Sequence, residues 1–160
     1  MISVNPERYS GSSNSCPTEE PMFTTEQHLV DSFVCLLESA ATPWGSVRVG
    51  REFFYARGRT DVIAVAEEGT LIAFEAKLRD WRTALDQAYR NTCFAHGSYV
   101  LLPKKAALNA IRCVGEFEKR GVGLCYVDGV GIVVLIRSPL APPLEPWLAS
   151  QALSQVQQCY

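Results

Sequence analysis

The chain has 160 residues, of which 48% are hydrophobic, and a formal net charge of −2 at pH 7. This length and apolar content suffice for one sizeable core but not for two, so we expect a single small domain. The slight acidic balance argues against a broadly basic surface. No apolar run is long enough to span a bilayer and the N-terminal segment has no hydrophobic signal core, so we expect a cytoplasmic protein.

The first segment of the chain, residues 1–22, is rich in Ser, Pro, Asn and Glu and shows no periodicity, so we expect a disordered lead-in. Thr24 or Thr25 can then cap a helix that continues to about Ser39. Its apolar stripe consists of Leu29, Phe33, Leu36 and Leu37. Glu26 lies on the same stripe, where it is either solvated in the first turn or aimed inward.

The next elements are three predicted strands, the first of which covers Val47–Tyr55. Two further strands, residues 58–66 and 70–77, flank the loop Glu67-Glu68-Gly69, which has the length and final glycine of a common three-residue hairpin. If Ala66 faces Thr70, the register continues to a pairing of Asp61 with Glu75.

Directly opposite residues of a hairpin share a face, and side chains alternate along each strand. Asp61, Glu75 and Lys77 therefore converge on one face. The opposite face carries an apolar set, namely Val62, Ala64, Ile72, Phe74 and Ala76. Two carboxylates beside an ammonium group can hold a hard divalent cation, an arrangement that suits phosphodiester hydrolysis.

The remaining elements alternate between helices and strands, which gives a mixed α/β fold class with the order αβββαβαββ. We expect helices from Asp80 to about Ala95 and from Lys104 to Arg120, the latter stopped by Gly121. The expected strands are Ser98–Leu102, Val122–Val127 and Val130–Ile136. Residues 23–137 form the predicted domain, and residues 138–160 form a Pro-rich linker with a short helix over Leu144–Val156.

Asp61, followed after 14 residues by Glu75-Ala76-Lys77, resembles the motif of the PD-(D/E)XK nuclease superfamily, whose fold is called restriction-endonuclease-like. Family members also carry a glutamate on a helix before the first strand, a position that Glu26 matches better than Glu38. A glutamine on the helix after the lysine strand is matched by Gln87. The resemblance covers residues 24–135 approximately, and Thr60 replaces the proline of the motif.

The resemblance implies an αβββαβ core with helices on both sides of a central mixed sheet, and a metal-dependent deoxyribonuclease activity. Asp61, Glu75, Lys77 and Gln87 would be the catalytic residues. Glu26, Asp61, Glu75 and the carbonyl of Ala76 would hold Mg²⁺ or Mn²⁺, and Lys77 would orient or activate water.

Basic residues gather around the proposed site although the net charge is negative. Arginine forks suit phosphates. We therefore expect nucleic acid to contact Arg57, Arg59, Arg79 and Arg82. The chain leaves open whether the substrate is DNA or RNA and whether cleavage is endo- or exonucleolytic; DNA is the partner expected from the resemblance. Cleavage of both strands of a duplex would favour a homodimer.

The six cysteines form no CxxC pair or other metal-ligand spacing, so we expect buried free thiols and no iron-sulfur cluster. Two other functional classes stay open. One is a catalytically silent member of the same fold that binds nucleic acid or regulates a partner. The other is a protein-interaction domain in which Glu75-Ala76-Lys77 is only an exposed strand end.

Overall fold

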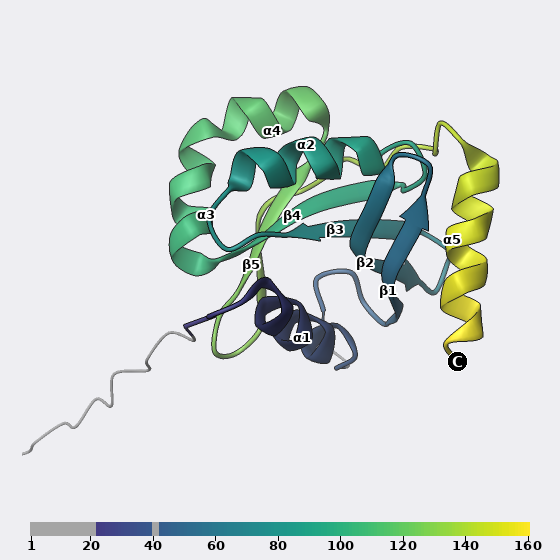
Figure 1. Cartoon of the computed structure of the whole chain (residues 1–160), viewed down its shortest axis with the longest axis horizontal. Coiled ribbons are helices and arrows are strands. Elements are labelled where there is room, and N and C mark those ends of the chain that lie inside the picture. Colours follow the sequence, from purple (N-terminus) through teal and green to yellow (C-terminus); the bar gives the residue numbers. More distant parts are fainter. Residues whose placement is uncertain (1–21, 40–41) are drawn as a thin grey trace, which may run out of the picture.

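The computed structural model describes residues 22–39 and 42–160 (Figure 1). The lead-in predicted for residues 1–22 lies outside the described residues, apart from Met22. Among the helices of the described part, none is both long enough and apolar enough to cross a membrane.

A six-stranded mixed sheet forms the centre of the domain, which confirms the predicted α/β fold class. Its strands lie side by side in chain order, and adjacent pairs are antiparallel at both ends but parallel for β3–β4 and β4–β5. The strands are β1 (Val47–Tyr55), β2 (Gly58–Ala66), β3 (Leu71–Ala76), β4 (Gly97–Pro103), β5 (Gly123–Val127) and β6 (Ile132–Ile136). The two parallel connections use helices, as such crossovers generally require.

Helices cover both faces of the sheet (Figure 1). Helix α1 (Glu26–Leu37), capped by the Thr25 side chain as predicted, packs on the face that carries Val62 and Phe74. The other helices pack on the opposite face. They are α2 (Trp81–Asn91), α3 (Lys104–Ala110), α4 (Val114–Arg120) and α5 (Pro146–Gln158).

The β2–β3 hairpin has the register that the sequence predicts. Val65 pairs with Leu71, and Ile63 with Ala73. The backbone N–H of Ala66 donates to the Thr70 carbonyl at 3.0 Å, and Gly69 ends the loop with a φ of 87°. The backbone pairing stops at Val62 and Phe74, one pair before Asp61 and Glu75, and this interruption shapes the site described below.

The single helix predicted for Lys104–Arg120 is wrong in its middle. A 3-10 turn, η1 (Ile111–Cys113), separates α3 from α4, and Cys113 leaves helical geometry with φ −108° and ψ 38°. The β-branched Ile111 and Val114, followed by Gly115, lower helix propensity at this point. Gly121 ends α4 in the left-handed region, as predicted.

The C-terminal helix α5 protects the edge of the sheet. Its buried residues Leu148, Ala152 and Val156 join the core formed by β1, β2 and β3. Two polar side chains of this C-terminal segment also bind the edge strand: the Gln155 amide on α5 donates to the Arg51 carbonyl at 3.0 Å, and the hydroxyl of Tyr160, beyond the end of α5, accepts from the Val49 N–H at 3.1 Å. These bonds occupy backbone groups that an exposed edge would offer to another chain.

All five cysteines within the described residues are free thiols, whereas Cys16 lies outside that range. Cys93 and Cys125 are buried, as expected. Cys35 and Cys159 are exposed instead, because each lies on the outer side of a helix rather than in the core.

The packing of α5 on β1 can be tested at Gly50, where an added Cβ would lie 3.0 Å from Val156 Cγ2 and 3.1 Å from Ile63 Cγ1. Because overpacked cores lose about 1–3 kcal/mol, we expect Gly50→Ala to lower the free energy of unfolding by roughly 1 kcal/mol. In a Val156→Ala background the same substitution should cost less, as measured by urea unfolding. Gly129→Ala, whose Cβ meets nothing within 4 Å, is the control; equal effects at both glycines would contradict this packing.

Candidate functional site

A polar cleft of about 160 Å³ lies where β2, β3 and α2 meet. Asp61 from β2 and Glu75 from β3 line it together with Lys77, which follows β3 directly. The C-terminal half of α2 contributes Gln87, Arg90 and Asn91, and the β1–β2 hairpin contributes Tyr55 from the end of β1, Arg57 from the turn and Arg59 from the start of β2. The structure thus brings together all four residues expected to be catalytic.

The carboxyl groups of Asp61 and Glu75 interact directly, through charge and through a hydrogen-bonding contact between the side chains. Asp61 is held by the backbone: its Oδ2 accepts the Ala76 N–H at 2.9 Å, in place of the strand partner that the hairpin no longer supplies. Its Oδ1 lies 3.4 Å from Arg59 Nη2. The predicted convergence of the two acids is therefore present, but Asp61 achieves it with its side chain rather than through a backbone pair.

Glu75 is an acid in an unfavourable position for its charge. Only 2% of its surface is exposed. Burial raises the pKa of Glu75 to about 8, and the neighbouring charge of Asp61 adds to this effect. The hydrogen bond from Asn91 and the charge of Lys77 act in the opposite direction but do not compensate. Without a further cation, Glu75 holds its proton at neutral pH.

Asn91 orients Glu75 through a short hydrogen-bond network. The Asn91 amide donates from Nδ2 to Glu75 Oε1 at 2.7 Å. The Tyr55 hydroxyl and the Thr60 hydroxyl both donate to Asn91 Oδ1, at 2.7 and 2.8 Å. Because two hydroxyl donors face the amide oxygen, the amide nitrogen is directed to Glu75. Burial raises the pKa of Tyr55 to about 12, so its hydroxyl remains a donor.

Lys77 lines the cleft and also contacts Glu26, whose Oε2 lies 3.3 Å from Lys77 Nζ. Of the residues expected to hold a metal, Glu26 contacts Lys77 and does not line the cleft with Asp61 and Glu75. Within residues 22–39 and 42–160, no group of three or more His, Cys, Asp or Glu side chains is arranged to hold a metal ion. The reason is topological: α1 packs on the sheet face opposite to Glu75, and Lys77 lies between them. The rival Glu38 caps the far end of α1 and is exposed.

Gln87 presents an unused acceptor to the cleft. Its Oε1 is buried and has no hydrogen-bond partner, and the residue lines the same space as Asp61 and Glu75. Buried polar atoms are nearly always satisfied, so an orphan at a site indicates a ligand. The two carboxyl groups and the Gln87 amide oxygen line one cleft and offer only oxygen donors, whereas Ala76 contacts Asp61 through its N–H. Such a set fits Mg²⁺ or Mn²⁺.

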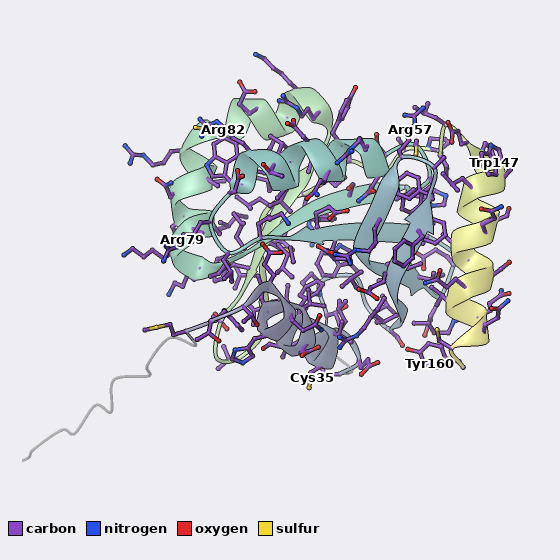
Figure 2. The ribbon with its side chains drawn as sticks, viewed as in Figure 1. Cys35, Arg57, Arg79, Arg82, Trp147 and Tyr160 are labelled. Atoms are coloured by element: carbon purple, nitrogen blue, oxygen red, sulfur yellow. The ribbon has the colours of Figure 1, made fainter. Side chains whose placement is uncertain are left out.

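The four arginines expected to contact nucleic acid do not form one surface. Arg57 and Arg59 line the cleft. Arg79 and Arg82 lie at the other side of the molecule, before and within the first turn of α2 (Figure 2). The Arg82 guanidinium stacks on Trp81, 4.1 Å from the ring centroid. The two pairs lie at different ends of α2, whose 11 residues span a length of about 16 Å.

Sequence reasoning missed Tyr55, Thr60, Arg90 and Asn91 as residues of the site. A signal existed for Asn91, since it follows Gln87 by four positions and shares its helix face. Tyr55 had no such signal, because alternation along β1 is broken at Glu52, whose φ is 54°. Thr60 had none either, because it is adjacent to Asp61 on β2 and strict alternation would place the two side chains on opposite faces. Gly50 and Phe53 consequently both face α5, although strict alternation would separate them.

Comparison with protein-family models gave no match, and comparison with curated proteins gave none either. Among solved structures, the chain is similar to SPO1766, a protein of unknown function from Silicibacter pomeroyi, with a TM-score of 0.62, 14% sequence identity, and coverage of 86% of this chain and 88% of that one. At this identity the likeness shows the fold alone. SfsA of Pyrococcus furiosus in complex with Ca²⁺ also matches, with a TM-score of 0.32, 12% identity, and coverage of 57% of this chain and 54% of that one. That score is too low to indicate a shared fold.

The raised pKa of Glu75 predicts a stability that depends on pH. Between the ordinary value of 4.5 and the folded value of about 8, the folded protein retains a proton that the unfolded chain has released. The contribution of Glu75 to stability therefore falls as the pH rises through this window and is constant above it. Glu75→Gln should remove this dependence and raise the free energy of unfolding at pH 9 in EDTA by a few kcal/mol.

Urea unfolding at pH 5, 7 and 9 measures this effect, with the exposed Glu67→Gln as the control for loss of a carboxylate. An unchanged pH profile for Glu75→Gln would contradict the assignment of a raised pKa to Glu75.

Asn91→Ala should destabilise the protein because it leaves Glu75 Oε1 and the hydroxyls of Tyr55 and Thr60 without their partner. A buried group left unsatisfied costs about 1–3 kcal/mol, so we expect a loss of roughly 2–3 kcal/mol. The pKa of Glu75 should also rise further, because the hydrogen bond from Asn91 lowers it. The midpoint of the pH-dependent stability should then move to higher pH, whereas Asn109→Ala, at an exposed asparagine, should leave both quantities unchanged.

Proposed function

We propose that the protein is a divalent-metal-dependent nuclease that hydrolyses phosphodiester bonds of DNA. The observation that carries this proposal is the contact between the Asp61 and Glu75 carboxyl groups, with Lys77 lining the same cleft. Two carboxyl groups in contact at a buried strand end lower the stability of the fold. Such unfavourable arrangements are typical of functional sites, where the chemistry requires them.

A divalent cation resolves the electrostatic problem of this cleft. Asp61 and Glu75 repel each other when both are ionised, and Glu75 is almost fully buried. A cation that binds both would lower the pKa of Glu75 and convert the repulsion into attraction. When bound, Mg²⁺ or Mn²⁺ would polarise the phosphoryl group and favour ionisation of the attacking water.

The protein groups supply position and charge. The Ala76 N–H and Arg59 fix Asp61, while Asn91 fixes Glu75, so both acids are pre-organised. Lys77 places an ammonium group beside the reacting phosphate, where it can orient water and stabilise developing negative charge. Glu26 contributes by positioning the Lys77 ammonium group through an ion pair of 3.3 Å, so we assign it a positioning role rather than that of a metal ligand.

Arginine side chains at the cleft suit a phosphate substrate. Arg57, Arg59 and Arg90 all line it, and the guanidinium fork matches phosphate oxygens in geometry. The choice of DNA over RNA comes from the resemblance to PD-(D/E)XK nucleases in the residues Asp61, Glu75-Ala76-Lys77 and Gln87.

A second candidate function is a nucleic-acid-binding module without catalysis. The observations in its favour are the engagement of Lys77 by Glu26 and the presence of two acids rather than three in the cleft. Binding of Mg²⁺ or Mn²⁺ separates the two functions, because a silent module has no need for a cation between Asp61 and Glu75.

The catalytic test uses isosteric substitutions, which keep the fold. The protein should cleave DNA at low ionic strength with Mg²⁺ or Mn²⁺ and not in EDTA. Asp61→Asn and Glu75→Gln should abolish both cleavage and metal binding measured by calorimetry. Lys77→Met should lower the cleavage rate by roughly 100-fold while metal still binds, because the loss affects charge stabilisation rather than the ligands.

Lys119→Met, an exposed lysine on α4, is the matched control and should behave as the unaltered protein. Cleavage that persists equally in Lys77→Met and Glu75→Gln would show a contaminating nuclease. Metal-independent DNA binding, without cleavage of single strands, duplexes, flaps or four-way junctions, would favour the silent module.

A further inference from the structure

A second and larger hollow lies at the ends of the three parallel strands. It has a volume of about 1160 Å³ and is formed by the segments that follow β3, β4 and β5, together with the start of α1. In open α/β sheets, ligands bind outside the carboxyl ends of the strands. Lys77 lines both this groove and the cleft that contains Asp61 and Glu75, so the two spaces are neighbours.

Basic side chains outnumber acidic ones in the groove. Four basic side chains line it, namely Lys77, Arg79, Lys104 and Lys105. Three acids also line it, but each already has a structural role. Glu26 binds Lys77, Asp80 caps α2 through the Thr83 N–H and hydroxyl, and Asp128 accepts the N–H groups of Val130 and Gly131. Arg79 and Lys105 are exposed and available for an anionic ligand.

Apolar side chains lie between these charges. Phe23, Leu78 and Pro103 line the groove, and Met22 stands at its rim with 86% of its surface exposed. A groove that combines positive charge with apolar and aromatic surface suits a single strand of nucleic acid, whose phosphates meet the basic groups and whose unstacked bases meet the apolar groups. A duplex does not fit this pattern because its bases are stacked inside.

We propose that this groove binds single-stranded DNA that continues from the cleft, with Arg79 and Lys105 contacting its phosphates. This inference rests on the proposed function, since it specifies the substrate of the same site. The volume supports an extended ligand, because pockets for small molecules usually measure about 300–1,000 Å³. Lys77 lies at the junction, where the strand passes from the groove to the paired acids.

Binding can be measured separately from cleavage. The probe is a fluorescent 12-nucleotide oligothymidine, titrated with the full chain in EDTA and followed by anisotropy. Arg79→Glu combined with Lys105→Glu should raise the Kd at least 10-fold and reduce the slope of log K against log salt by about 1.4, since each phosphate contact on a single strand contributes roughly 0.7. Arg112→Glu combined with Lys119→Glu gives the same change in net charge at exposed sites on η1 and α4, and should change the Kd less than 2-fold.

If the two double variants weakened binding of the oligothymidine equally, the proposal would be overturned, because the loss would reflect net charge rather than the groove. Tighter binding of a hairpin duplex than of the single strand would overturn it as well. Failure of the nuclease proposal gives a different result. Neither the unaltered protein nor Glu75→Gln would then cleave DNA, while the groove variants would still bind single-stranded DNA more weakly.

Discussion

The carboxyl groups of Asp61 and Glu75 interact directly, and several elements of the structure hold them in this position. Asp61 is accessible to solvent only in part, and Glu75 is almost fully buried. The surrounding elements are arranged to support this contact. The β2–β3 hairpin lacks its last backbone pair, and the Asp61 side chain accepts the Ala76 N–H there instead. The amide of Asn91 on α2 donates to Glu75. Each of these hydrogen bonds orients a carboxyl group, and neither supplies a positive charge to it.

Asn91 and Lys77 connect the acid pair to the rest of the fold in different ways. Asn91 links Glu75 to β1 and β2 through Tyr55 and Thr60, so the position of an acid on β3 depends on an edge hairpin. That hairpin in turn is held by α5 and the residues after it, whose side chains occupy the outer backbone groups of β1. Lys77 links the cleft to Glu26 on the other face of the sheet. The site therefore depends on helices that pack on both faces of the sheet, namely α1 through Glu26 and α2 through Asn91.

Much of the fold follows from local chemistry in the sequence. Local conformational preferences are enough to explain three features: the helix cap at Thr25, the turn at Gly69 and the helix end at Gly121. The register of β2 with β3 is of the same kind, because a short loop fixes which residues can pair. The unbroken helix predicted for Lys104–Arg120 failed because apolar periodicity does not register the cumulative loss of helix propensity at Ile111, Val114 and Gly115.

Alternation and a known turn are enough to predict that Asp61, Glu75 and Lys77 lie together at one end of a hairpin, although the backbone pair between Asp61 and Glu75 does not form. The groups that surround these three residues depend on how distant elements pack. Glu26 pairs with Lys77 because α1 packs on the far face of the sheet, and Tyr55 reaches Asn91 because the backbone at Glu52 breaks the alternation of β1. Contacts between elements distant in the chain depend on packing, which no local pattern contains.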